Sequence, residues 1–437
     1  MVLSTYQTND SISPADLRTR KIKQELHQKL LAHMDLSVIG AMNDGEIRQE
    51  LRRGAEELCR VQAELMSSAE RDRLISDLMD ETFGLGPLEP LLNDPTISDI
   101  LINGPANVYV ERRGQLQMTG ITFNDNRHLE DIVQRIVSRS GRRVDESSPM
   151  VDTRLPDGSR VNAVIPPLAL DGALVSIRKF PGRPLCAADL VRTGSCSQEM
   201  IDFLAACVQS RLNIVISGGT GSGKTTLLNI LSSYISDDER VATIEDAAEL
   251  QLQQPHVARM ESRPANIEGK GEVTTRDLLK NSLRMRPDRI IIGECRGQET
   301  YDMLQAMNTG HDGGMTTIHA NTARDAIGRL EMLQALAGFD SPTWMIRKQI
   351  ASAIHIVVQV NRLAGGKRKI TSISEVTGFD GQVISMHDLF VFKRTGMTPR
   401  RVVQGYFTAT GIRPECLVRI EESGHVFPFE YFEECHE

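Results

Sequence analysis

Aromatic side chains are scarce in this chain of 437 residues, because phenylalanine, tyrosine and tryptophan together make up 4% of it, with one tryptophan. Proteins that stack on bases or sugars depend on such side chains, so the scarcity weighs against those functions. Basic residues are not in excess either: 50 lysines and arginines stand against 58 aspartates and glutamates, a net charge of −8. The positive balance typical of general nucleic-acid binders is therefore missing, and no nucleic-acid partner is expected.

Long apolar runs and paired cysteines are also lacking. No run approaches the roughly 18 residues that a membrane-spanning helix needs, and the first ten residues are polar, so neither a span nor a signal peptide is predicted. The seven cysteines are scattered, and none forms a C-x-x-C pair. This pattern favours reduced thiols in the cytoplasm and predicts no structural zinc.

What the chain does contain is an ordinary globular composition, with 25% charged and 40% hydrophobic residues, which suits two or three domains. Hydrophobic residues at every fourth position predict amphipathic helices near the N-terminus, which form either a solvated arm or a docking element. Hairpin and strand patterns follow, then a Pro/Gly-rich break, then strands and helices in alternation, which indicates an α/β fold with a parallel sheet. The expected organisation is a disordered tail over 1–15, a helical bundle over 16–80, an α+β domain over 81–180, a linker or hinge over 181–198 and an α/β domain over 199–437.

The strongest motif matches G-x-x-x-x-G-K-[ST] in full, between an apolar strand at 213–217 and a helix from Thr226. Glycines let several backbone N–H groups converge on phosphate oxygens, and the helix N-terminus adds its dipole. A chance glycine-rich turn is the alternative, which the strand–loop–helix context disfavours. No guanine-reading N-K-x-D follows, so ATP is the expected nucleotide. The predicted nucleotide-binding residues are Gly218, Gly219, Thr220, Gly221, Ser222, Gly223, Lys224, Thr225 and Thr226.

A second motif, over 286–294, is a short apolar strand that ends in an acid and resembles a Walker B segment. Gly293 stands where the magnesium-side aspartate is expected, so Glu294 is the candidate base that orients the attacking water. Mg²⁺ must then be held by Thr225, water and another carboxylate, for which Glu245 and Asp246, after the strand at 241–244, are candidates. A solvated acidic helix start is the alternative reading of these carboxylates.

A third motif, over 310–321, carries His311 and His319 on a glycine-rich run and the strand that follows it. Three readings are open: metal ligands, a plain core strand, or a sensor that hydrogen-bonds the terminal phosphate. No third ligand stands at zinc-like spacing, which disfavours the metal site. The phosphate sensor is the preferred reading of His319, with His311 as a further nucleotide contact.

These three motifs, in this order behind an α+β domain, resemble those of the type II/type IV secretion and pilus-assembly ATPases. The tail sharpens the resemblance toward the tight-adherence (Flp, type IVc) pilus branch, through 375–378, 388–392 and 405–414, and so does the segment 83–88. The resemblance implies a RecA-like motor domain behind the α+β domain, a homohexamer, and ATP hydrolysis with Mg²⁺. It also implies a cytoplasmic location at the bacterial inner membrane, where the ring would drive a polytopic platform protein in pilus assembly or retraction.

The resemblance further implies that arginines of the α+β domain reach the nucleotide. Arg160 and Arg178 match the positions of such arginines, and Arg154 matches less well. Lys280 stands where relatives often place an arginine, whereas Arg284 fits the pattern. Surface arginine is the alternative reading of each. Two other functions stay open at this point: a nucleic-acid translocase on a RecA-like ring, and a nucleotide-gated scaffold without useful turnover.

Overall fold

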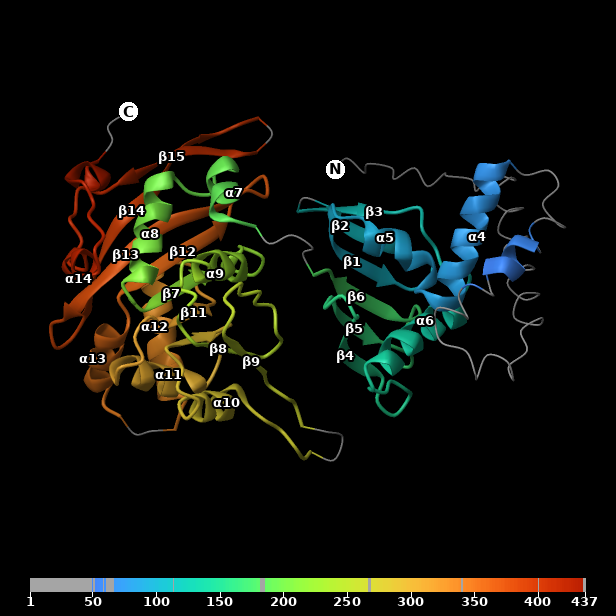
Figure 1. Ribbon diagram of the computed structural model, residues 1–437, viewed down its shortest axis with the longest axis horizontal. Coiled ribbons are helices and arrows are strands. Elements are labelled where there is room, and N and C mark those ends of the chain that lie inside the picture. The colour runs from blue at the N-terminus through green and yellow to red at the C-terminus, as the bar shows by residue number, and fades with distance from the viewer. Residues whose placement is uncertain are drawn as a thin grey trace, which may run out of the picture. The chain divides into compact units, whose positions relative to one another are not determined.

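The computed structural model describes residues 49, 52–57, 59, 67–112, 114–180, 185–265, 269–338, 341–399 and 401–434. The predicted disordered tail over 1–15 and most of the predicted helical bundle over 16–80 lie outside these residues. The chain divides into two compact units, Met1–Gly182 and Arg183–Glu437, coloured from blue to green and from green to red (Figure 1).

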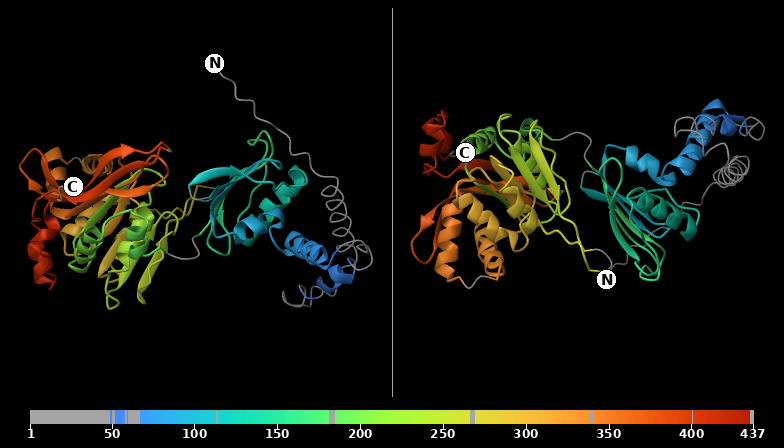
Figure 2. Two further views of the ribbon diagram at one scale, coloured as in Figure 1. Left: turned by 90° about the horizontal axis from the view of Figure 1, so that it is seen from above. Right: turned by 60° about the horizontal axis from the view of Figure 1, so that its bottom comes forward.

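The first unit is an antiparallel six-stranded sheet with helices on one face (Figures 1 and 2). The strand order is β3-β2-β1-β6-β5-β4. The predicted hairpin is confirmed as the pair β2–β3. The helix over Asn126–Arg139 ends shortly before Gly141, whose φ is +68°. The described elements are α4 (Ser68–Phe83), α5 (Glu89–Asn93), β1 (Ile97–Asn103), β2 (Val108–Arg112), β3 (Gln115–Met118), α6 (Asn126–Arg139), β4 (Met150–Arg154), β5 (Arg160–Val164) and β6 (Leu174–Arg178), with a short 3₁₀ turn at Gly86–Leu88.

Apolar and polar residues alternate along these strands, so the apolar side chains lie on the face of the sheet that the helices cover. Val161, Ala163, Val175 and Ile177 are buried against α6 residues such as Ile132, while the residues between them are exposed or half-buried. An antiparallel sheet of this kind presents its other face to solvent or to a partner.

The second unit is a nine-stranded sheet of order β15-β14-β13-β12-β7-β11-β10-β8-β9. Strands β12, β7, β11, β10, β8 and β9 are parallel, as predicted, and β13 to β15 add antiparallel hairpins. The described elements are α7 (Ala187–Arg192), α8 (Gln198–Gln209), β7 (Ile214–Gly218), α9 (Lys224–Ser232), β8 (Val241–Glu245), β9 (Val257–Glu261), α10 (Thr275–Ser282), β10 (Arg289–Ile292), α11 (Glu299–Asn308), β11 (Met315–Ile318), α12 (Ala323–Ala335), α13 (Thr343–Ala353), β12 (Ile356–Arg362), β13 (Arg368–Phe379), β14 (Ile384–Met397), β15 (Val403–Ala409) and α14 (Leu417–Glu422), with a 3₁₀ turn at Phe429–Phe432.

Helices cover both faces of this sheet, which explains why its central strands are fully buried (Figure 1). Helices α8 and α9 pack with one hydrophobic cluster, and α10 to α13 pack with another on the opposite face. The topology is that of a RecA-like P-loop α/β domain, so the predicted fold class is confirmed.

Part of the segment predicted as a linker is folded. Helix α7 lies within 181–198, and its Leu190 and Val191 pack against the first of these clusters. The stretch from Ala187 onward is therefore part of the second unit, and its role as a hinge stays a prediction.

Candidate active site

The phosphate-binding loop joins the end of β7 to the start of α9, at the carboxyl edge of the parallel strands. Gly221 and Gly223 have φ values of +67° and +101°, a left-handed conformation that favours glycine. Gly218 is required by packing, because a Cβ there would lie 2.3 Å from the carbonyl oxygen of Val360 on β12. These three glycines therefore allow the sharp loop that presents backbone N–H groups and the N-terminus of α9.

Lys224 is the first residue of α9 and is only 7% exposed. Its Nζ donates a hydrogen bond to the carbonyl oxygen of Gly219 at 3.1 Å and lies 3.4 Å from Nε2 of His319, which follows β11. Burial, and secondly the charge of Lys224, lower the pKa of His319. The imidazole is therefore neutral at neutral pH and is available as a hydrogen-bonding group.

Glu294 follows β10, and its carboxylate lies between two partners. Oε2 accepts a 2.6 Å hydrogen bond from Nη2 of Arg296. Oε1 lies 2.9 Å from Nε2 of His319, but the contact is not aligned as a hydrogen bond, so this buried oxygen has no hydrogen-bond partner among the described residues. Lys224, His319 and Glu294 thus form a continuous chain of contacts across three neighbouring parallel strands.

Glu245 occupies the space that the unusual Gly293 leaves. A Cβ on Gly293 would lie 2.9 Å from Cγ of Glu245, which ends the adjacent strand β8. Glu245 is 3% exposed, and its Oε2 accepts hydrogen bonds from the N–H groups of Glu249 and Leu250 at 2.6 and 3.0 Å. Its Oε1 is buried without a hydrogen-bond partner among the described residues, and burial raises the pKa of the carboxyl group.

Asp246 has a structural contact instead. Its Oδ1 accepts a 2.8 Å hydrogen bond from the hydroxyl of Thr275, the first residue of α10. Of the two carboxylates considered for Mg²⁺, Glu245 is therefore the one with a buried oxygen atom that has no hydrogen-bond partner among the described residues, whereas Asp246 is exposed.

Two residues predicted to contact the nucleotide lie at the other end of the strands. His311 precedes β11, and its N–H donates to the carbonyl oxygen of Ala306 near the end of α11. Arg284 is exposed and follows α10, which runs from Thr275 at the carboxyl edge back toward the start of β10. In a parallel sheet, residues that precede a strand lie at the amino edge, and residues that follow it lie at the carboxyl edge. Within the second unit, neither residue therefore lies at the phosphate-binding loop, which is at the carboxyl edge.

Three arginines at this edge were missed by sequence reasoning. Arg368, at the start of β13, donates from Nε to the carbonyl oxygen of Gly221 at 2.9 Å. Arg362, at the end of β12, lies with its Nη1 3.7 Å from the position of a Cβ on Gly221. Arg296 holds Glu294, and that hydrogen bond raises the pKa of Arg296. The cluster of basic residues over 362–369 is the sequence feature that could have indicated Arg362 and Arg368 as part of the site.

In the first unit, the three arginines singled out from the sequence form one cross-strand row. Arg154 is directly opposite Arg160, and Arg160 is directly opposite Arg178. Since directly opposite residues share a face, all three lie on the face that α6 does not cover. Like charges in directly opposite positions are unfavourable, and the row also has an opposite charge, because Asp99 of β1 stands directly opposite Arg178 on its other side.

Two kinds of feature are absent from the described part of the chain. Its residues include no group of three His, Cys, Asp or Glu side chains placed to bind a metal ion. None of its helices is both long and apolar enough to cross a bilayer.

Comparison with known proteins identifies the type II/IV secretion system protein family, whose model matches residues 81–396. A candidate conjugal transfer protein of Mycobacterium tuberculosis is 38% identical over 312 residues, which are 70% of this chain and 88% of that protein. The type IV secretion system protein VirB11 of Bartonella henselae is 33% identical over 68% of this chain and 94% of its own length. Among solved structures, the VirB11 ATPase of Brucella suis shares 30% identity, covers 67% of this chain and 97% of that chain, and has a TM-score of 0.37.

Proposed function

Because this chain belongs to the type II/IV secretion system protein family, we propose that it is the ATP-hydrolysing motor of a pilus-assembly system of the tight-adherence (Flp) type or of a related secretion system. The observation that supports this most is the contact chain from Lys224 through His319 to Glu294 at the phosphate-binding loop. In this proposal the cation of Lys224, the neutral imidazole of His319 and the carboxylate of Glu294 would surround the terminal phosphate of ATP.

Each of these groups has a chemical task in hydrolysis. The loop N–H groups and Lys224 bind the phosphates, so charge that develops on the phosphate oxygens is stabilised. Glu294 orients a water molecule and accepts its proton, for which the oxygen without a hydrogen-bond partner is available. Neutral His319 hydrogen-bonds the terminal phosphate. Because His319 also contacts Glu294, loss of that phosphate would change the surroundings of the base.

The residues present fit a magnesium ion bound together with ATP. Glu245 Oε1 is buried without a partner among the described residues, and a carboxylate oxygen is a ligand that Mg²⁺ prefers, directly or through water. The hydroxyl of Thr225 is the second proposed ligand. The ion would neutralise charge on the phosphates.

The arginine row of the first unit is proposed to add positive charge to the same reaction. ATP with Mg²⁺ keeps about two negative charges, more than Lys224 alone can balance. Arginine supplies planar, paired donors that suit phosphate groups. Loss of phosphate would remove this attraction, which gives a physical basis for a nucleotide-driven movement.

The working assembly is proposed to be a homohexamer on the cytoplasmic face of a bacterial inner membrane, with a polytopic platform protein as its partner. Membrane extracts from cells that produce the tagged Glu294→Gln variant with ATP should yield an integral membrane protein. The Lys224→Ala variant, which cannot hold ATP, should yield much less of it. Equal recovery with both variants, or recovery of soluble proteins alone, would argue against a motor that acts on a membrane platform.

The arginine row is tested by replacing Arg154, Arg160 and Arg178 one at a time with glutamine. Each variant should bind ATP nearly normally and lose about 10- to 1,000-fold in turnover, the scale of one charged transition-state donor. Arg127→Gln, on the exposed side of α6, is the matched control and should keep full turnover. If all three row variants hydrolyse ATP like the control, the row has another purpose.

A further inference from the structure

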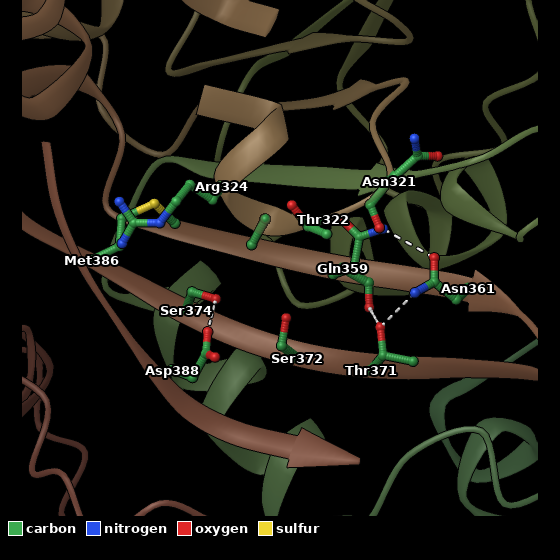
Figure 3. A pocket seen from close by; sticks show the side chains of 11 residues that line it. Asn321, Thr322, Arg324, Gln359, Asn361, Thr371, Ser372, Ser374, Met386 and Asp388 are labelled. Carbon is green, nitrogen blue, oxygen red and sulfur yellow. Dashed lines mark hydrogen bonds between the residues drawn. The ribbon is translucent and has the colours of Figure 1, made fainter. Parts of the chain in front are cut away.

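A polar cavity of about 340 Å³ lies at the edge of the second unit, between the start of α12 and strands β12 to β14 (Figure 3). Side chains of β12 alternate: Val358 and Val360 pack in the cluster that contains α9 residues, whereas Gln359 and Asn361 line the cavity. The cavity is therefore on the opposite face of the sheet from α9, and the backbone of β12 separates it from the phosphate-binding loop.

Gln359 holds an unsatisfied acceptor at this cavity. The side chain is 2% exposed, and its Nε2 donates to the carbonyl oxygen of Asn321 and to Oδ1 of Asn361, both at 3.0 Å. These contacts fix the orientation of the amide, so Oε1 faces no hydrogen-bond donor among the described residues. An unpaired buried acceptor destabilises the folded chain, and a ligand with a suitably placed N–H group would relieve this cost.

The other polar groups give the cavity a positive end. Arg324, in the first turn of α12, is exposed and has no ion pair with any residue that the structure describes. The N-terminus of α12, capped by Thr322, points its free N–H groups and dipole to the same end. Asp388 is the opposing charge, and its Oδ1 already accepts a 2.6 Å hydrogen bond from the hydroxyl of Ser374 (Figure 3).

We propose that this cavity is a second binding site, which takes a carboxylate-bearing segment of a protein partner. The carboxylate would pair with Arg324 at the start of α12, and a backbone N–H group beside it would donate to Oε1 of Gln359. A cavity of this volume is at the small end of ligand sites and admits an acidic side chain with its adjoining peptide group. Gln359 Nε2 donates to the carbonyl oxygens of Ala320 and Asn321, the two residues that directly follow His319. The site is distinct from the nucleotide site, and its ligand does not depend on the proposed motor function.

The test uses the full chain without nucleotide and two small blocked probes of equal shape. N-acetyl-glutamate amide carries the carboxylate and the peptide N–H groups, and N-acetyl-glutamine amide lacks only the charge. Ligand-observed NMR titration should show binding of the acidic probe and at least about five-fold weaker binding of the neutral one, the scale of one exposed ion pair. Equal binding of both probes, or no binding of the acidic probe at about 50 mM, would overturn the proposal.

Variants then locate the bound probe. Arg324→Gln should weaken the acidic probe at least about five-fold, while Lys348→Gln, an exposed cation on α13, should not change its affinity. Asp388→Asn should leave affinity unchanged or increase it, because it removes a repulsive charge and keeps the acceptor for Ser374. If Arg324→Gln binds the acidic probe as wild type does, or if N-acetyl-lysine amide binds better and is lost in Asp388→Asn, the cavity is not a carboxylate site.

Discussion

Both edges of the parallel sheet in the second unit carry buried carboxylates. At one edge the carboxylate is paired with an arginine, and at the other edge carboxylate oxygens have no hydrogen-bond partner among the described residues. At the amino edge, Arg289 is buried and donates from Nε and Nη2 to both carboxylate oxygens of Glu239, at 2.7 and 2.9 Å. At the carboxyl edge, Glu294 and Glu245 each keep one buried oxygen with no hydrogen-bond partner among the described residues. Paired charges hold the strands in place, whereas oxygens without partners are available to water, a proton or a metal ion.

The comparison teaches that topology, more than residue type, separates structural from reactive groups. In parallel sheets the loops after the strands form the binding edge, and the loops before them form the supporting edge. The second and third motifs of this chain include the strands β10 and β11 and therefore reach both edges. A residue's role depends on which side of that strand it stands.

The largest effect is expected from Glu294→Gln at the carboxyl edge. The amide keeps the shape of the side chain but cannot take the proton of the attacking water, so single-turnover hydrolysis should fall by about 10²–10⁴-fold. Binding of a fluorescent ATP analogue should stay within a few-fold of wild type. Lys224→Ala, which removes the only lysine of the loop, is the control that loses binding. Residual hydrolysis within a few-fold of wild type would show that Glu294 is not the base.

A large effect of another kind is expected from Arg289→Met at the amino edge. Glu239 then keeps the partly exposed Arg211, whose Nη2 lies 2.9 Å from its Oε2. Removing one member of a buried pair costs about 3–5 kcal/mol, so the free energy of unfolding in urea should fall by that amount. Turnover per folded molecule should remain near wild type.

The paired variant sharpens this prediction. Adding Glu239→Leu to Arg289→Met should restore much of the lost stability, because no buried carboxylate is left without a partner. A loss of turnover that persists in the stable double variant would mean that the amino edge contributes to catalysis, and the contrast between the edges would fail.

Sequence reasoning predicted the elements whose patterns are local. The strand before the phosphate-binding loop, the helix after it and the hairpin β2–β3 depend on neighbouring residues, and all three are present. The parallel sheet was also predicted, because apolar strands alternated with helices. The residues at the carboxyl ends of β7, β10 and β11 could therefore be placed together from the amino-acid sequence alone.

What could not be predicted depends on long-range neighbours. Arg154, Arg160 and Arg178 form a row because β4 pairs with β5, and β5 pairs with β6, in a particular register. The local sequence of each strand does not determine that register. Glu245 fills the space beside Gly293 because β8 lies next to β10 in the sheet order. Within the second unit, Arg284 and His311 lie on the far side of their strands from the phosphate-binding loop, and their roles at the nucleotide stay predictions.

A moderate, pH-dependent effect is expected from His355 at the amino edge. Its Nδ1 accepts a 3.0 Å hydrogen bond from the N–H of Asn213, and burial, with a smaller effect of Arg419, lowers its pKa from 6.5 to about 4. A lowered pKa means that the unfolded chain binds the proton first. The contribution to stability is therefore complete above pH 6.5 and is lost as the pH falls toward 4.

The size of this effect is measurable with a matched variant. Between pH 7.5 and pH 4.5, wild type should lose about 2–3 kcal/mol more of its unfolding free energy than His355→Gln, whose amide oxygen can accept the same hydrogen bond without titrating. Urea unfolding at the two pH values measures the difference. Parallel loss in both proteins would mean that His355 is not the titrating group.

The smallest effect, and the sharpest test of the comparison, is expected from His311→Ala. His311 and His319 belong to one motif, but β11 separates them, and only His319 reaches Lys224 and Glu294. Single-turnover hydrolysis should therefore stay within about two-fold in His311→Ala and fall by at least about 10-fold in His319→Ala, which loses a hydrogen bond to the reacting phosphate. Both variants should first be shown to unfold at similar urea concentrations, because His311 Nδ1 is buried and its loss changes packing. Equal losses of hydrolysis in two equally stable variants would mean that the amino edge takes part in the reaction, and the division of labour between the two edges would have to be abandoned.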